Sequence, residues 1–215
     1  MSRKVYNFRK CIRNNGITLA LIIYYRKILN KAYNYLVLGR LDTHVDSRAK
    51  NFRIKKIIKI GKNFSSARGL WLEAVSEYNG QIINPQIIIG DNVSFSEFNH
   101  VGATSYIEIG NNVLFGSKCY VTDHNHGVYK GDIQSSVNIP PANRDLTVGS
   151  SVVIEDHVWV GDNVVILPNV KIGYGSIIGA NSVVTKDIPP CSIAVGAPIK
   201  VIKTWNNITN KWENV

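Results

Sequence analysis

Residues 148–189 read VGSSVV-IEDHVW-VGDNVV-ILPNVK-IGYGSI-IGANSV-VTKDIP, so each six-residue unit opens with an aliphatic side chain. An earlier stretch, IGDNVS-FSEFNH-VGATSY, begins at Ile89. The pattern then skips Ile107 and Glu108 and resumes as IGNNVL-FGSKCY-VTDHNH at Ile109. Short internal repeats of this kind determine the architecture of the whole chain.

The period of six fits neither a helical stripe, which repeats every ~3.6 residues, nor simple strand alternation. It fits a chain that runs extended for a few residues and turns at Gly, Asp or Asn, where a positive φ is often required. Three such segments close a triangular coil of about 18 residues, and stacked coils pair their strands in parallel. The opening residue points inward, and the fifth residue also packs inside at Val93, Val113, Val152, Val158, Val164, Ser176 and Ser182.

This pattern resembles the hexapeptide-repeat acyltransferases over roughly residues 83–122 and 148–195, about half of the chain. The resemblance implies an all-β fold, a left-handed parallel β-helix. A non-enzymatic solenoid or a carbonic-anhydrase relative on the same fold are the alternatives, because fold alone does not decide function. We expect the β-helix over residues 63–202, a mainly helical segment over residues 1–62, and a short helix or tail over residues 203–215.

The composition suits one folded domain with an appendage, since 45% of the 215 residues are hydrophobic. Cys11, Cys119 and Cys191 are odd in number and widely spaced, so neither a disulfide framework nor a zinc motif is predicted. The start of the chain has no signal-peptide pattern. These features favour a cytoplasmic location.

The N-terminal segment carries the basic character of the chain. Residues 1–62 hold 16 Lys or Arg and two acidic residues, whereas the remainder holds nine and 13. The apolar run at 16–25 is shorter than the ~20 residues that a bilayer span needs. A basic helix with aromatic residues suits peripheral contact with the inner membrane face, and packing on the coil end is the alternative. No nucleic-acid partner is expected, because no recognised DNA- or RNA-binding motif accompanies the charge.

The repeat is interrupted by a loop over residues 123–147, which begins with the string DHNH. Long irregular loops on a rigid scaffold tend to carry binding and catalytic groups. The string resembles the maltose, galactoside and related sugar O-acetyltransferases, especially those acting on surface polysaccharides. This resemblance implies that His124 is the general base, since an imidazole accepts a proton near neutral pH. The sugar hydroxyl would then attack the acetyl-CoA thioester directly, and His126 is the reserve candidate.

Two residues are candidates to orient His124. Asp123 is adjacent, although neighbouring side chains of an extended segment point apart, which favours a role for it in the loop. Asn99 lies at a corner about one coil earlier, together with His100, and could approach His124 in space. The sequence departs from the family here, because Ser96 stands where several members have an active-site Asn.

Three histidines offer an alternative chemistry. His100, His124 and His126 could hold zinc, as the carbonic anhydrases on this fold do. Their spacing differs from the spacing in those enzymes, so no metal is expected.

The C-terminal half of the repeat supplies the cofactor prediction. The strings HVWVG at 157–161, GANSVVTKDIPP at 179–190 and VGAPIKVI at 195–202 resemble the family's acetyl-CoA-binding segments. The resemblance implies that Trp159 faces the pantetheine arm and that Gly161 and Ala180 offer backbone contacts. Thr185 and Lys186 would meet the nucleotide end. Lys200 stands where relatives often have Arg, giving a point charge in place of a two-pronged donor for phosphate.

The combined expectation is an acetyl-CoA-dependent O-acetyltransferase for a sugar hydroxyl in surface-polysaccharide biosynthesis. The acceptor would be a nucleotide sugar, a lipid-linked oligosaccharide or a growing glycan, and the resemblance implies a homotrimer. The alternatives are an N-acetyltransferase for an amino sugar, a metal-dependent lyase or hydratase, and a scaffolding solenoid. At the C-terminus a short helix is predicted, with Trp205 and Trp212 on one face.

Overall fold

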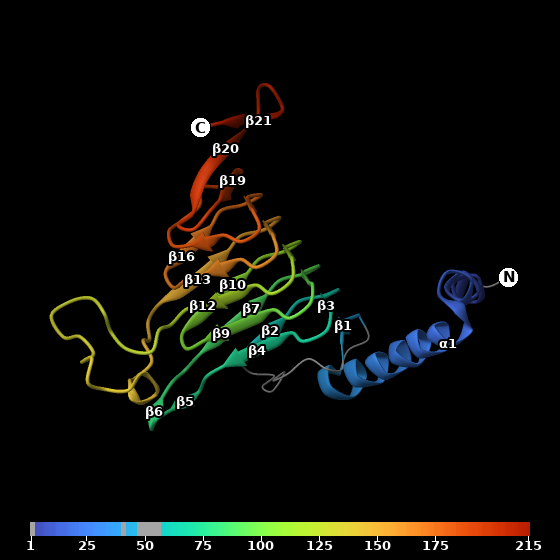
Figure 1. Cartoon of the computed structure of the whole chain (residues 1–215), viewed down its shortest axis with the longest axis horizontal. Coiled ribbons are helices and arrows are strands. Elements are labelled where there is room, and N and C mark those ends of the chain that lie inside the picture. The colour runs from blue at the N-terminus through green and yellow to red at the C-terminus, as the bar shows by residue number, and fades with distance from the viewer. Residues whose placement is uncertain (1–2, 40–41, 47–56) are drawn as a thin grey trace.

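The computed structural model describes residues 3–39, 42–46 and 57–215. The chain begins with helix α1 (Arg3–Tyr33), which continues into a π-helical turn, η1 (Asn34–Leu38). The strands that follow wind into a stack of coils, and α1 projects from the N-terminal end of that stack (Figure 1). Within the described ranges, no helix combines the length and apolarity needed to cross a membrane.

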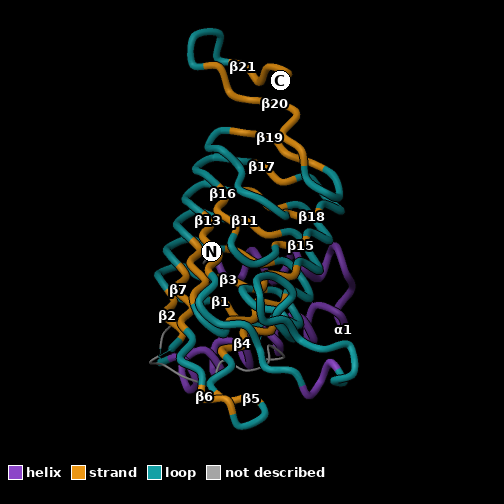
Figure 2. The backbone as a smooth tube through the Cα atoms, turned by 90° about the vertical axis from the view of Figure 1, so that its left-hand side faces the viewer, coloured by secondary structure: helices purple, strands orange, loops and turns teal. Residues whose placement is uncertain are grey.

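Three parallel sheets form the faces of the coil stack, which Figure 2 shows from the side. The first face comprises β2 (Ile58–Ile60), β7 (Gln86–Ile89), β10 (Tyr106–Ile109), β13 (Ser151–Ile154) and β16 (Val170–Ile172). The second comprises β1 (His44–Val45), β3 (Ser65–Ser66), β8 (Ser94–Phe95), β11 (Leu114–Phe115), β14 (Trp159–Val160) and β17 (Ile177–Ile178). The third comprises β4 (Trp71–Ala74), β9 (His100–Ala103), β12 (Tyr120–Thr122), β15 (Val165–Ile166) and β18 (Val183–Val184). The predicted parallel β-helix is confirmed.

The repeat register holds in the core with one exception. The seven predicted fifth-position residues are all buried, as are the opening residues Ile154, Val160, Ile166, Ile172, Ile178 and Val184. Val148 is the exception, because its side chain is 56% exposed. The chain rejoins the coil only at β13, so the residues just before Ser151 still belong to the loop.

Glycine and asparagine have different structural roles at the corners of the coil. A Cβ on Gly110 would lie 2.3 Å from Asp156 Oδ1, so glycine is required there for the close approach of the next coil. Asn92 and Asn112 adopt left-handed backbone conformations, each with φ of 58°. The Asn92 side chain also donates to Asn112 Oδ1 at 3.0 Å, which links successive corners. The positive φ expected at the corner therefore falls on asparagine in these units.

The C-terminal residues form a hairpin, and the prediction of a helix there is wrong. β19 (Ser192–Val195) continues the second face, and β20 (Lys200–Asn206) pairs antiparallel with it and with β21 (Lys211–Asn214). Trp205 lies opposite Trp212 with ring centroids 5.4 Å apart. The open edge of the last coil offers backbone partners to an extended segment, which favours a strand over an isolated short helix.

The coil also begins earlier than residue 63, where its boundary was predicted. β2 and β1 both precede that residue, and β1 pairs with β3 of the first coil. The helical part of the N-terminal segment spans α1 and η1, residues 3–38. Gly16, with φ of 75°, divides α1 into two arms.

Candidate active site

Successive coils differ at the corner where the third face passes into the first, which we call the loop vertex. Residues 75–85 contain a hairpin of β5 (Glu77–Tyr78) and β6 (Gln81–Ile82). One coil later the same corner is a tight turn at residues 104–105, and one coil after that it is the long loop 123–150. Figure 1 shows the hairpin and the long loop projecting from the same side of the stack.

The hairpin and the long loop meet across the tight turn. The Tyr78 hydroxyl donates to the Ala142 carbonyl at 2.8 Å. The Gln81 side chain donates to the Leu146 carbonyl and accepts from the Leu146 amide, both at 3.0 Å. These contacts hold the two segments together as a rim around the first residues of the loop.

Asp123 is fully buried and ties the start of the long loop to the turn below it. Its Oδ2 accepts from the amides of Ser105 and Tyr106, each at 2.8 Å. Its Oδ1 accepts from the Thr104 amide at 2.8 Å and lies 3.1 Å from His124 Nδ1. The carboxylate therefore anchors the loop to the tight turn, and it also contacts His124, because the chain bends after Thr122.

His124 is held through one edge of its ring. Nδ1 lies 3.1 Å from Asp123 Oδ1 and 3.2 Å from Thr122 Oγ1, and the side chain is 11% exposed. A buried carboxylate at Nδ1 favours the tautomer with the proton on that nitrogen. The lone pair of Nε2 is then available to accept a proton from a bound molecule, which is the geometry of a general base.

Burial and hydrogen bonding act in opposite directions on Asp123. Burial alone would raise its pKa, but hydrogen bonds from His124 and from the Thr104 and Ser105 amides outweigh burial and lower its pKa below the ordinary value. Asp123 is therefore ionised at neutral pH. A fixed negative charge beside Nδ1 stabilises the imidazolium that forms when His124 takes a proton.

His100 lies beside His124, across Gly102. A Cβ on Gly102 would lie 3.5 Å from both His100 Nε2 and His124 Cε1, so the glycine leaves space between the two imidazoles. His100 Nε2 is 3.2 Å from Glu73 Oε2, and its ring stacks on Trp71 at 4.1 Å. Burial lowers the pKa of His100, and the Glu73 hydrogen bond only partly opposes that shift. A neutral His100 therefore faces the same space as His124.

Asn99 is placed differently from His100. Its side chain is buried, donates to the Ser96 and Gly116 carbonyls at 2.9 Å, and accepts from the Cys119 amide at 2.9 Å. All of these partners are backbone groups of neighbouring corners. The structure thus brings His100, and not Asn99, next to His124.

His126 lies on the rim of the site. Its Nδ1 is 3.2 Å from the Tyr78 hydroxyl, and the two rings meet edge to face. Among the residues that the structure describes, no three His, Cys, Asp or Glu side chains converge as a metal site would require.

The predicted cofactor residues lie along the coils beyond His124. Trp159, on the second face, is half exposed, and Gly161 follows it at the corner before the third face. Thr185 and Lys186 lie at the loop vertex two coils from His124, a rise of about 10 Å at the usual strand spacing. Lys186 and Lys200 are exposed, and neither lies in an ion pair with another described residue.

The backbone groups at Gly161 and Ala180 are not equivalent. The Gly161 amide donates to the Ile178 carbonyl at 2.8 Å, and its carbonyl accepts from the Cys119 thiol at 3.1 Å. Within the described part of the chain, the Ala180 amide donates to no acceptor. Ala180 is therefore the corner that offers a free backbone donor.

Sequence reasoning missed the hairpin at residues 75–85 and the pairing of Glu73 with His100. The alignment of strands on the third face would have revealed this pairing. On that face, His100 lies between its direct strand neighbours Trp71 and Tyr120. Residues two apart on a strand share a face, so Glu73 follows Trp71 onto the outer surface.

The family described as bacterial transferase hexapeptide (six repeats) matches residues 151–186. WbbJ of Escherichia coli (strain K12), provisionally named a lipopolysaccharide biosynthesis O-acetyl transferase, is 42% identical over 157 residues, covering 73% of this chain and 76% of WbbJ. SACOL2570 of Staphylococcus aureus (strain COL), provisionally named an acetyltransferase, is 37% identical over 130 residues, covering 54% of this chain and 64% of that protein.

Among solved structures, AntD, an N-acyltransferase from Bacillus cereus in complex with dTDP and 3-hydroxybutyryl-CoA, has a TM-score of 0.59. The identity is 22%, and the match covers 78% of this chain and 82% of AntD. This likeness concerns the fold, whereas the match to WbbJ extends over most of both sequences. The chain belongs to the hexapeptide-repeat transferases, and it is an acetyltransferase.

Proposed function

We propose that this protein transfers an acetyl group from acetyl-CoA to a sugar hydroxyl during surface-polysaccharide biosynthesis. The observation that carries the proposal is the Asp123–His124 pair, which leaves His124 Nε2 available at the loop vertex. His124 Nε2 takes the hydroxyl proton while the oxygen attacks the thioester carbonyl carbon. The carbon–sulfur bond then breaks, and the thiolate of coenzyme A recovers the proton from His124. The similarity to WbbJ supports a lipopolysaccharide-type acceptor.

A second candidate is N-acetyl transfer to an amino sugar, which the likeness to the N-acyltransferase AntD favours. AntD was solved with dTDP, so a nucleotide-linked sugar is an acceptor worth testing for both chemistries. A panel of hydroxy- and amino-sugar acceptors, each with and without a nucleotide, separates the two. Acetylation confined to amines would overturn O-acetylation.

Acetyl-CoA would lie along the third face, between the corner that holds Gly161 and Ala180 and the loop vertex that holds Lys186. The free Ala180 amide supports this placement, because it can donate to an amide oxygen of the pantetheine arm. Exposed Lys186 and Lys200 would supply charge to the phosphates.

Replacing Lys186 with alanine is expected to weaken acetyl-CoA binding about tenfold, because a charge-assisted hydrogen bond at an exposed site contributes roughly 1–1.5 kcal/mol. Calorimetry on the native protein and the variant measures the change. Lys59→Ala is the matched control, since Lys59 is an exposed lysine on the first coil. No heat of binding to the native protein at high acetyl-CoA concentration would reject the donor.

The space above Gly102 is the proposed seat of the acceptor hydroxyl. Gly102→Ala would place a methyl group 3.5 Å from both imidazoles, which is ordinary van der Waals contact. The fold should tolerate it, but we expect kcat/KM for the acceptor to fall at least about tenfold, because small misplacements of reacting groups are costly. Acetyl-CoA binding should be unchanged. Equal acceptor kinetics in both proteins would place the hydroxyl elsewhere.

A homotrimer with sites between neighbouring subunits is also part of the proposal, as is a membrane-associated acceptor at the inner face of the membrane. Light scattering at several protein concentrations measures the mass of the assembly. A monomer at all concentrations would exclude sites shared between subunits.

A further inference from the structure

The second arm of α1 carries large apolar side chains that the rest of the chain leaves exposed. Ile17, Leu21, Tyr25 and Ile28 are 55–66% exposed and follow one another at helical spacing. Ile22 and Leu29, which flank them, are also exposed. We call these side chains the apolar stripe, and its members are Ile17, Leu21, Ile22, Tyr25, Ile28 and Leu29.

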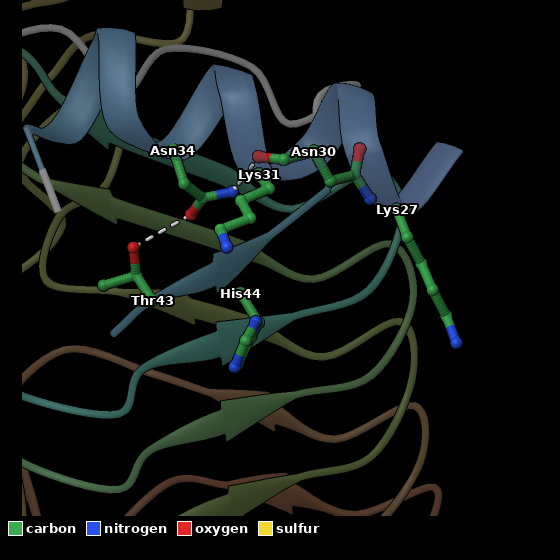
Figure 3. Close-up of a pocket in the computed structure, with 6 residues that line it drawn as sticks. All are labelled: Lys27, Asn30, Lys31, Asn34, Thr43 and His44. Carbon is green, nitrogen blue, oxygen red and sulfur yellow. Dashed lines mark hydrogen bonds between the residues drawn. The ribbon is translucent and has the colours of Figure 1, made fainter. Parts of the chain in front are cut away.

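The apolar stripe faces away from the coil stack. Asn34 is buried at the other side of the helix, where it accepts from Thr43 Oγ1 and the Val45 amide and donates to the Val45 carbonyl, all within 3.0 Å. Figure 3 shows Asn34 and Lys31 directed toward Thr43 and His44, around a cavity of about 480 Å³. Tyr25 lies nine residues before Asn34, which is about 2.5 turns and so the opposite side of the helix.

The charge around the apolar stripe has a single sign. Residues 3–39 contain no Asp or Glu, and the cations whose side chains are described are Arg9, Lys10, Arg13, Arg26, Lys27 and Lys31. Helical spacing places Arg26 at one margin of the stripe, whereas the Lys31 side chain is directed toward the first coil. An apolar face beside basic side chains, with no acid on the helix, is the pattern of a helix that lies in the interface of an anionic membrane.

We propose that the apolar stripe and the basic side chains of α1 dock the helix onto an anionic lipid bilayer. The stripe would enter the boundary between headgroups and acyl chains, while the basic side chains contact lipid phosphates. The Asn34 hydrogen bonds would fix the docked helix to the first coil. This inference goes beyond the proposed function, since it holds for any acceptor.

The test is sedimentation of the full chain with vesicles of phosphatidylcholine alone or with one quarter phosphatidylglycerol. We expect binding to the anionic vesicles that weakens with added salt. Leu21→Glu/Ile28→Glu should abolish it. The control Ile208→Glu, at a side chain that is 92% exposed on the C-terminal hairpin, should not.

The cations are tested separately. Each Lys or Arg near an anionic surface contributes roughly a fivefold increase in partitioning, so Arg26→Gln should lower partitioning about fivefold. Lys211→Gln removes an exposed lysine on the C-terminal hairpin and should have little effect. Acetyl-CoA calorimetry on every variant tests whether the fold is intact. Because acetyl-CoA binding is measured without vesicles, it also distinguishes a failure of membrane docking from a failure of the proposed function.

Three results would overturn the inference. The first is equal binding to neutral and anionic vesicles, and the second is binding that survives in Leu21→Glu/Ile28→Glu. The third is a fall in the mass of the assembly in that variant, which would assign the apolar stripe to contact between copies of this chain.

Discussion

Replacing His124 with alanine is expected to lower kcat by about 10²–10⁴-fold while leaving acetyl-CoA binding unchanged. A general base contributes a factor of this size when it removes a proton in the transition state. The side chain is nearly buried, but among the described residues it hydrogen-bonds only to Thr122 and Asp123, so the loss should not unfold the coil. Steady-state acetyl transfer and calorimetry on the same preparation measure the two quantities.

His126→Ala is the matched control, since it removes a second imidazole two residues away on the rim. It is expected to change kcat by less than about tenfold, because that ring contacts Tyr78 and has no carboxylate at its Nδ1. The assignment of His124 would be wrong if its variant kept native turnover, or if the His126 variant lost more activity than the His124 variant did.

Replacing Asp123 with asparagine is expected to lower both activity and stability. An amide NH₂ at either oxygen position would face hydrogen-bond donors that now point at the carboxylate. Leaving buried donors unpaired costs about 2–4 kcal/mol in the free energy of unfolding. Loss of the charge also removes the preference for the Nδ1–H tautomer of His124, so kcat should fall roughly 10²-fold or more.

The pH dependence of the free energy of unfolding separates the stabilisation due to the charge of Asp123 from the stabilisation due to the shape of its side chain. Its folded pKa is lowered relative to the unfolded value of about 3.9, so ionised Asp123 stabilises the fold above that pH. This contribution is lost as pH falls through the folded pKa. In urea unfolding at equal protein concentration, the native protein should be more stable than Asp123→Asn at neutral pH, and the two should converge in acid. A difference independent of pH would contradict the charge-based explanation.

Much of the candidate site could be predicted because the hexapeptide register is strict. The break in register after Val121 located the loop, and the string that starts it located His124. The prediction that Asp123 serves the loop is consistent with its three backbone amide partners. Its contact with His124 was not predicted, because the bend after Thr122 depends on the turn of the coil below.

Asn99 and His100 show where the register was not enough. They are adjacent in sequence, but Asn99 lies in the corner before β9 and bonds to corner backbone, whereas His100 begins β9 and points outward toward His124. Glu73 is 27 residues from its partner His100, with a hairpin between them. A hairpin of that length interrupts the six-residue repeat between β4 and β9. The repeat alone therefore does not predict which residues of these two strands are neighbours.

The sequence by itself determined the parallel β-helix, all but one of the predicted inward-facing residues and the catalytic candidate in the loop. A repeat of six residues, stacked by backbone hydrogen bonds, directs the opening and fifth side chains of each unit into the core. Tertiary structure alone decided what surrounds His124, the strand conformation of Trp205 and Trp212, and the exposed stripe on α1. These features depend on contacts made by the hairpin, the long loop and the two ends of the stack. In those places the six-residue repeat does not predict which residues are neighbours.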